Sequence, residues 1–495
     1  MVNIFSSKKN IEKPGPSIDK ENGQKKQRVP SKISECENLV KTILGNSSDV
    51  IVKTFETRYE KAMIVYIDGL VEKDLVGRDI IRPLKARGFD GKIAPALNAL
   101  YTQSKDMSAF ADNVLTGEVA IFYGNSKTVY FIELRGWEHR AIEEPTAEAT
   151  IRGPKEGFTE NIRTNTAMIR RKIKTPDLRL ENIVLGKQSK TIVTMVYIDH
   201  IVNQDILKEV KKRLSEINTD MILETGHIEQ FIEKNTFSPI SGIGLTQKPD
   251  KLANCISEGR VAILCDGTPH ALIIPDLFIE NFHTSEDNYT RVSYCGMVRI
   301  LRVFGLFLAV MLPGMTIAIL TFHHEMVPAI FLTTVVTSSE QTPMPIAAEI
   351  LLMTVLFELL REGGTRMPKA VGSAITIVGS LIIGDTAVRA GIVSAPSVII
   401  VAISAVTSFV LPNLNEYILI YRGVFWLFGS IMGLIGIGTA YVIMMTQIIS
   451  TESFGVPVLS SFSKNELKDS IIRFPWRSLK YRPTSIARQN VKRRG

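Results

Sequence analysis

The sequence predicts an α/β region of two related subdomains, followed by an all-α domain with several transmembrane helices. Two observations predict this division of the 495 residues. The last third of the chain contains three uncharged, apolar runs of at least 20 residues, whereas the first 300 residues are charged throughout. Within that charged part, two sequence patterns each occur twice at similar separations, which indicates a duplicated unit.

The three apolar runs are long enough to form membrane helices. They are Val303–Phe322, Gly391–Pro412 and Gly423–Ile449. A bilayer core of about 30 Å requires roughly 20 apolar residues of helix. One charged residue at the bilayer centre costs about 2.5–3.5 kcal/mol, and these runs contain none. We therefore expect each run to cross the membrane.

Two shorter segments complete the predicted membrane domain, which covers residues 296–450. The segment 345–361 contains two glutamates, so an interfacial or re-entrant helix is expected there. The segment 368–386 is rich in small residues and supplies one more span. Four spans are then expected: 303–322, 368–386, 391–412 and 423–449. Four spans place both ends of the chain on one side of the membrane. Five spans would separate the ends, and this alternative stays open.

Both ends of the chain are basic. Residues 1–30 contain seven Lys and Arg against three Asp and Glu, with almost no large apolar residues, so a disordered leader is expected. In residues 464–495 the ratio is ten to two, which is typical of a cytosolic tail, here 451–495. The first apolar run of span length lies beyond residue 300. We therefore expect no signal peptide, and the α/β region should also lie on the cytosolic side.

The duplicated unit is visible in two pairs of sequence echoes. The motif VYID occurs at Val65–Asp68 and again 131 residues later at Val196–Asp199. Gly117–Leu134 and Gly259–Leu277, 142 residues apart, each read as two strands around a short turn. We expect a first subdomain at 31–150, a connection at 151–190 and a second subdomain at 191–295. Asp68 and Asp199 are expected to cap the helices that follow them, and Asp266-Gly267 to form a hairpin turn.

The connection between the subdomains carries a basic helix. Four cations crowd this segment: Arg163, Arg170, Arg171 and Lys172. They are a candidate docking face for a partner or an anionic headgroup. An ordinary surface helix joining two subdomains is the alternative.

The segment 370–385 is the candidate for a pore lining. Helical spacing gathers small and polar residues towards one side of it: Gly372, Thr376, Gly379, Ser380 and Gly384, with Asp385 at the end. Small residues allow membrane helices to approach closely. Alternatively they form a narrow water-lined face, with Asp385 as a polar ring at its mouth if subunits assemble around it.

The sequence lacks the motifs that are typical of several classes of function. It contains no Walker, HExxH, GxSxG or kinase motif, so we expect no enzyme, and neither a cofactor nor a metal. The four cysteines form no CxxC pair and should be reduced packing residues. The basic ends lack interleaved aromatic residues, so nucleic acid is not an expected partner.

Four blocks of the sequence resemble the A subunit of bacterial spore germinant receptors. They are IRGPKEGFTENIRTNTAMIRRKI, PMPIAAEILLMTVLFELLREGGTRMP, AVGSAITIVGSLIIGDTAVRAGIVSAPSVIIVA and ESFGVPV. The resemblance extends in the same order from about residue 35 to 480. It implies a subunit in the inner membrane of dormant spores, beside a permease-like B subunit and a lipoprotein C subunit. Such a complex responds to nutrients and triggers release of ions and stored dipicolinate.

The resemblance also implies a role for each subunit. The B subunit would supply the main nutrient pocket, and the A subunit would form a homo-oligomeric, ion-conducting pore in the lipid, lined by Gly372–Asp385. Two alternatives stay open: a sporulation-protein paralogue acting in dipicolinate release, and a membrane-anchored scaffold for the receptor complex. A secondary transporter is disfavoured, because no repeat is visible within the membrane block.

Overall fold

The computed structural model describes residues 28–87, 101–136, 148, 150, 152–366, 382–459, 470, 473–475, 477–487, 492 and 493. The chain divides into two compact units. Residues 1–46 and 50–137 form the first unit, and residues 47–49 and 138–495 form the second.

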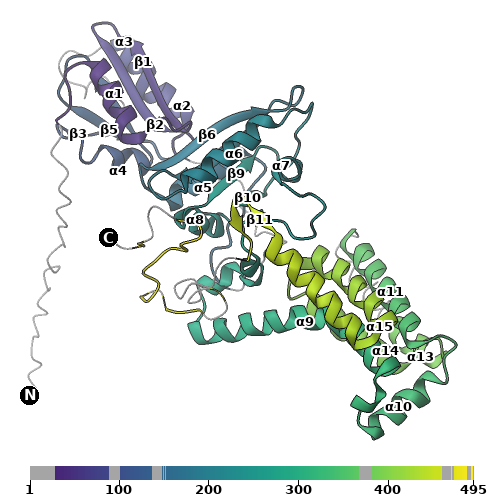
Figure 1. Ribbon diagram of the computed structural model, residues 1–495. Coiled ribbons are helices and arrows are strands. Elements are labelled where there is room, and N and C mark those ends of the chain that lie inside the picture. The colour runs from purple at the N-terminus through teal and green to yellow at the C-terminus, as the bar shows by residue number, and fades with distance from the viewer. Residues whose placement is uncertain are drawn as a thin grey trace, which may run out of the picture. The chain divides into compact units, whose positions relative to one another are not determined.

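The first unit is built on a five-stranded antiparallel sheet in the order β1-β2-β4-β5-β3 (Figure 1). Strands β2 and β4 are buried on both faces, because α1 and α4 pack on one side and η1 and α3 on the other. Their Val, Ile and aromatic residues suit such a position. The elements are α1 (Ile33–Leu44), β1 (Val50–Glu56), β2 (Lys61–Ile67), α2 (Lys73–Leu75), η1 (Val76–Ile81), α3 (Arg82–Arg87), β3 (Tyr101–Ser104), α4 (Phe110–Leu115), β4 (Glu118–Tyr123) and β5 (Val129–Glu133).

The second unit begins with a sheet of the same design. Its order is β6-β7-β9-β10-β8, which repeats the first order strand for strand. Helices α5 and α8 cover one face of this sheet, and α6 and α7 cover the other. The elements are α5 (Ile162–Lys172), β6 (Leu178–Leu185), β7 (Thr191–Ile198), α6 (Gln204–Glu216), α7 (Thr225–Ile232), β8 (Gly244–Thr246), α8 (Pro249–Ser257), β9 (Val261–Cys265), β10 (Ala271–Ile274), η2 (Phe278–Phe282) and η3 (Ser285–Asn288).

The sequence echoes are neighbours in these sheets. In the first sheet Val65 of the VYID motif pairs with Ala120 of the GEVA motif. In the second sheet the equivalent Val196 pairs with Ala262 of the GRVA motif. The echoes therefore mark the two central strands of each sheet, and the two α/β subdomains are related as expected.

Of the roles predicted for three aspartates, the structure contradicts two and confirms one. Asp68 and Asp199 do not cap helices: Asp68 pairs with Lys73 at 2.8 Å, and Asp199 with Arg179 at 3.3 Å. The cap of α6 is Asn203, whose side chain accepts from the amide of Asp205. The prediction of two aspartate caps was therefore wrong. The Asp266-Gly267 hairpin turn is confirmed, since it joins β9 to β10 and Gly267 has a φ of 91°.

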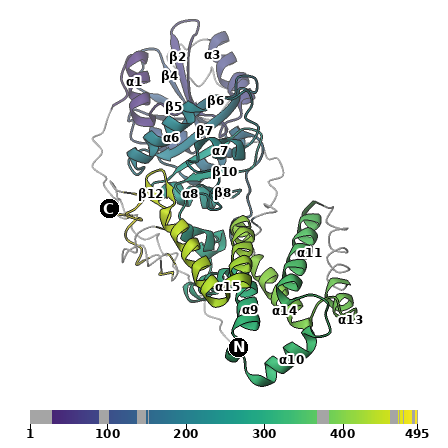
Figure 2. The same cartoon turned by 45° about the vertical axis from the view of Figure 1, so that its right-hand side comes forward.

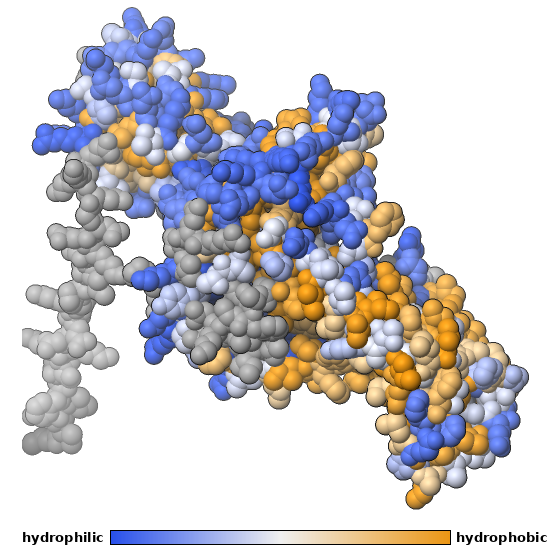
Figure 3. All heavy atoms as spheres, in the orientation of Figure 1, coloured by the Kyte–Doolittle hydropathy of each residue, from blue (hydrophilic) through white to orange (hydrophobic). Residues whose placement is uncertain are grey.

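From residue 292 to residue 457 the described part of the second unit consists of helices followed by a short strand pair, and the tail comes after it. Its elements are α9 (Val292–Phe322), η4 (His324–Met326), α10 (Ala329–Ser339), α11 (Ile346–Arg366), η5 (Ile382–Thr386), α13 (Ala387–Arg389), α14 (Ala395–Ser408), η6 (Pro412–Leu414), α15 (Asn415–Ser450), β11 (Glu452–Ser453) and β12 (Val456–Pro457). Two of the described helices, α9 and Pro412–Ser450, are long and apolar enough to cross a membrane. Apolar side chains gather over this region in Figure 3. The predicted fold class is confirmed: two α/β sheets, then a helical region with long apolar helices.

Helix α15 is not the single straight span expected at 423–449. Gly433 breaks it with φ 62° and ψ −140°, a conformation open almost only to glycine. The hydroxyl of Tyr421 is hydrogen-bonded to the side chain of Gln447, although a straight helix would separate these residues by about 39 Å. The chain therefore folds back into two arms, 415–432 and 434–450, which lie side by side in Figures 1 and 2. Each arm is about 26 Å long.

The arms of α15 pack closely on α9. A Cβ atom on Gly429 would lie 2.6 Å from the carbonyl oxygen of Gly314, so both glycines permit direct contact of the helix backbones. One apolar cluster joins Leu306 of α9 to Tyr417 and Ile448 near the two ends of α15. The same cluster includes Phe278 of η2, so both ends of α15 lie beside the second α/β subdomain.

Candidate functional site

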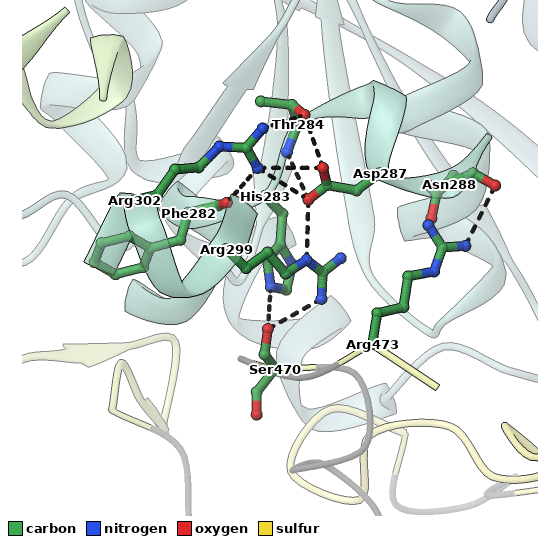
Figure 4. Close-up of polar contacts among 9 residues, drawn as sticks. All are labelled: Phe282, His283, Thr284, Asp287, Asn288, Arg299, Arg302, Ser470 and Arg473. Carbon is green, nitrogen blue, oxygen red and sulfur yellow. Dashed lines mark hydrogen bonds and ion pairs between the residues drawn. The ribbon is translucent and has the colours of Figure 1, made fainter. Parts of the chain in front are cut away.

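A cluster of charged residues links the second α/β subdomain to the first long helix (Figure 4). Arg299 and Arg302 lie one turn apart on α9, and both donate to the carboxylate of Asp287 in η3. Nε of Arg299 lies 2.9 Å from Oδ2 of Asp287, and Nη1 of Arg302 lies 3.1 Å from the same oxygen. Thr284 and Asp287 form a capping box at the start of η3, which fixes the carboxylate. We call Asp287, Arg299 and Arg302 the α9 joint.

The α9 joint is buried and also holds the C-terminal tail. Arg299 and Asp287 are 3% and 5% exposed. Arg299 donates to the carbonyl oxygen of Ser470 at 3.0 Å, and a ring nitrogen of His283 lies 2.7 Å from the same oxygen. Burial alone would raise the pKa of the Asp287 carboxyl, but the two guanidinium groups outweigh it, and this pKa lies below its usual range. Asp287 is therefore ionised at neutral pH, as the joint requires.

A second polar group lies where four helices meet, inside the apolar part of the helical region. Pro313 has no amide hydrogen, so the carbonyl oxygen of Ala309, four residues earlier, lacks its helical partner. Ser404 of α14 donates to that oxygen at 2.7 Å, and Nε of Arg422 of α15 donates to it at 3.0 Å. Arg422 also pairs with Glu358 of α11 at 2.9 Å. We call Ala309, Ser404, Arg422 and Glu358 the polar centre.

A third polar group fixes the start of α14. The carboxylate of Glu349 is fully buried and accepts from the amide and hydroxyl of Ser394, and from the hydroxyl of Ser397 at 2.7 Å. Thr342 donates to its other oxygen. A carboxylate at a helix N-terminus is stabilised by the free amides and by the helix dipole. Glu349 therefore acts as a cap for α14 supplied by another helix, α11.

The residues of the predicted docking face do not form one surface. Arg170 is 1% exposed and pairs with Asp49, with an Nε–Oδ2 distance of 2.8 Å, so its guanidinium is internal. Lys172 and Arg171 both lie near Glu156, at 3.0 and 3.7 Å. Arg163 is exposed at the first turn of α5. The inclusion of Arg170 is thus corrected, because its charge is needed inside the subdomain.

Most of the predicted pore lining lies outside the described residues: Gly372, Thr376, Gly379 and Ser380. The structure describes the last two members, Gly384 and Asp385, in η5. Asp385 is exposed and pairs with Arg389 one turn later at 2.8 Å. Among the described residues, no heavy atom lies within 4 Å of a Cβ placed on Gly384. An exposed ion pair of this kind contributes little to stability.

The polar centre was not predicted, although the sequence contains two signals of it. One is Pro313 within an apolar run, which always frees a carbonyl oxygen. The other is Arg422, a charge at the edge of an apolar run. Neither signal identifies the partner, because Arg422 and Glu358 are 64 residues apart.

Comparisons with known proteins find a family and several relatives that match most of the chain. Residues 38–485 match the family described as Bacillus/Clostridium GerA spore germination protein. The chain is 36% identical to Spore germination protein KA of Bacillus subtilis (strain 168), over 95% of this chain and 90% of that protein. It is 35% identical to Uncharacterized membrane protein YfkQ of the same organism, over 95% and 94%. The crystal structure of the N-terminal domain of the A subunit of the Bacillus megaterium spore germinant receptor GerK3 matches with 32% identity and a TM-score of 0.40, over 52% of this chain and 99% of that one.

Proposed function

Since this chain belongs to the GerA family of spore germination proteins, we propose that it is the A subunit of a nutrient germinant receptor and oligomerises into an ion-conducting channel. In this proposal a permease-like B subunit and a lipoprotein C subunit complete the receptor. Nutrient binding would then open the channel and trigger germination.

The observation that carries the proposal is the polar centre. An ionised residue within apolar helices is expensive, so it usually marks a site of transport or gating. Here Arg422 is 3% exposed and connects α9, α11 and α14 through Ala309, Glu358 and Ser404. A small rotation of any one helix would break at least one of these bonds. Such an arrangement suits a bundle with two discrete packings, as a gated channel requires.

We further propose that the α/β subdomains and the tail lie in the spore core, with the helices in the inner membrane. The contacts of the second unit support this orientation. Phe278 of the α/β region packs in one cluster with both ends of α15, and Ser470 of the tail binds the α9 joint. The start of α9, both ends of α15 and the tail therefore belong on one side. Movement of the α/β region would reach the helices through the α9 joint.

The proposed pore lining is tested by bulky substitutions in spores. Thr376→Phe and Gly379→Phe should reduce potassium release after nutrient addition while leaving the amount of protein unchanged. Gly438→Leu is the matched control, since no heavy atom of the residues that the structure describes lies within 4 Å of a Cβ at that glycine. Potassium release equal to the parent in both pore variants would refute the pore assignment.

Reconstitution tests the channel itself. The purified chain in a planar bilayer should conduct ions as an oligomer. Arg422→Met should either abolish this conductance or leave it constant, without opening and closing. A chain that stays monomeric in detergent and gives no conductance in any condition would instead favour the scaffold function, in which the helices only anchor the α/β region.

A further inference from the structure

A cavity of about 580 Å³ opens in the second unit, between the α/β subdomain and the start of α15. Its walls come from α7, β8, η2, the first turn of α15 and the tail, including His283, Arg299 and Ser470 of Figure 4. This volume lies in the range of small-molecule sites. None of the four residues of the polar centre lines this cavity.

The basic groups that face the cavity are already neutralised. Arg260 pairs with Glu280 and lies 3.6 Å from Glu258. Arg493 also pairs with Glu258, and Lys251 with Glu148 at 3.1 Å. Arg299 belongs to the α9 joint. The cavity therefore offers little to an anionic ligand.

Two carboxylates on the cavity wall, Glu229 and Glu416, lie in no ion pair with a basic group among the described residues, whereas Asp276 interacts with Arg260 and Lys251. Glu229 accepts one hydrogen bond, from Ser241 at 2.8 Å. Burial raises the pKa of its carboxyl, and the neighbouring Glu416 and Glu224 raise it further. Burial and Glu280 likewise raise the pKa of Asp276. The cavity wall therefore carries two carboxylates, Glu229 and Glu416, that are paired with no basic side chain among the described residues.

Two residues in the first turn of α15 that line the same cavity, Asn415 and Tyr417, have polar atoms without a partner among the described residues. The Oδ1 atom of Asn415 and the hydroxyl of Tyr417 are both buried, and neither has a hydrogen-bond partner among the described residues. Tyr417 is 1% exposed. A buried polar atom without a hydrogen bond costs free energy, and a bound ligand that supplied the missing hydrogen bond would remove this cost.

From these observations we propose that the cavity binds a small organic cation through a primary ammonium group. An ammonium carries three N–H donors and one positive charge, which matches the carboxylates of Glu229 and Glu416 and the carbonyl of Asn415. A metal ion fits less well: no three carboxylate, His or Cys groups among the described residues lie close enough together to hold one. The cavity volume leaves space for the carbon skeleton of the ligand. The inference does not depend on the channel function.

The test is binding of n-butylammonium and 1,4-diaminobutane to the full chain in detergent, measured by calorimetry and by the shift in Tm. Sodium butyrate, n-butanol and potassium chloride at equal ionic strength are the ligand controls. We expect both amines to bind and to raise Tm, and the controls to have no effect.

Substitutions separate this cavity from other acidic surfaces. Glu229→Gln and Glu416→Gln should each weaken amine binding about tenfold, the loss typical of one charge-assisted hydrogen bond. Glu216→Gln, at an exposed position of α6, is the matched control and should bind as the parent. Without amine, Glu229→Gln should be at least as stable as the parent, because the repulsion between Glu229 and the neighbouring carboxylates of Glu416 and Glu224 is removed. If the role of Glu229 were purely structural, Glu229→Gln would instead be less stable than the parent in the absence of amine.

The proposal is overturned if neither amine binds, if butyrate or potassium ion binds equally well, or if both Gln variants retain the parent affinity. Glu416 is exposed, so its variant tests the site even if Glu229→Gln fails to fold.

Discussion

Removal of Asp49 should unfold the surroundings of α5, because it leaves Arg170 as an isolated buried charge. The pair is bidentate: Nε and one terminal nitrogen of Arg170 lie 2.8 and 2.9 Å from the two carboxylate oxygens. The other donors reach Ser47 at 3.2 Å and the carbonyls of Thr175 and Leu178 at 3.3 Å. Breaking such a pair from one side costs about 3–5 kcal/mol. Asp49→Ala should destabilise the subdomain by this amount.

Hydrogen exchange measured by mass spectrometry on the full chain gives the local readout. About 3–5 kcal/mol corresponds to a loss of roughly two to four orders of magnitude in amide protection in α5 and β6, up to the limit set by global unfolding. Lys174→Ala, at an exposed site in the same segment, is the control and should leave protection unchanged.

The double variant Asp49→Leu with Arg170→Met distinguishes charge from packing. Removing both ions removes the desolvation cost, so the double variant should recover much of the protection lost in Asp49→Ala. Protection in Asp49→Ala equal to that of the parent would refute the reasoning and return Arg170 to the list of docking residues.

Three further predictions concern the helical region and its joint. Gly429→Leu should prevent a monodisperse folded state in detergent, because its Cβ would meet a backbone oxygen of α9 at 2.6 Å, whereas Gly438→Leu has open space and should chromatograph as the parent. Gly433→Ala should lower stability by about 1–3 kcal/mol, seen as a lower Tm, since alanine strongly disfavours a φ of 62° with a ψ of −140°. A Tm equal to the parent would contradict the fold-back of α15. Asp287 has a lowered pKa, so its stabilisation is complete above the ordinary carboxyl pKa of about 3.9 and is lost as pH falls through the lower folded value. Asp287→Asn should therefore reduce Tm at pH 7 and flatten its fall below about pH 4. If the Tm of Asp287→Asn fell below about pH 4 as steeply as that of the parent, this result would argue against the α9 joint.

The duplicated α/β design was predictable because short stretches of the sequence are enough to show each strand pair. Strand pairs leave alternating and β-branched patterns, and each unit repeats them in order. Val65 and Val196 could therefore be matched, and the structure pairs them with Ala120 and Ala262 in equivalent registers. The caps were misassigned because Asp, Asn and Ser suit a cap about equally, so the type of residue did not select Asn203.

The features missed by the sequence analysis depend on distant contacts. Arg170 looked like part of a basic surface, and only Asp49, 121 residues away, makes it internal. The fold-back of α15 was hidden for a similar reason. Gly433 is one of several glycines in an apolar run, and both a straight helix and a hairpin satisfy that pattern. The contact between Tyr421 and Gln447 decides between them, and it is a tertiary contact.

The sharp reversal at Gly433 has a consequence for how this polypeptide is threaded through lipid. A helix that doubles back delivers its continuation to the face from which it entered. If α15 lies in a membrane, as we propose, the passage from Asn415 to Ser450 crosses that membrane an even number of times. Ser450 would then lie on the same side as Asn415, and protease protection of an epitope inserted at Gly433 would report the side on which the reversal lies.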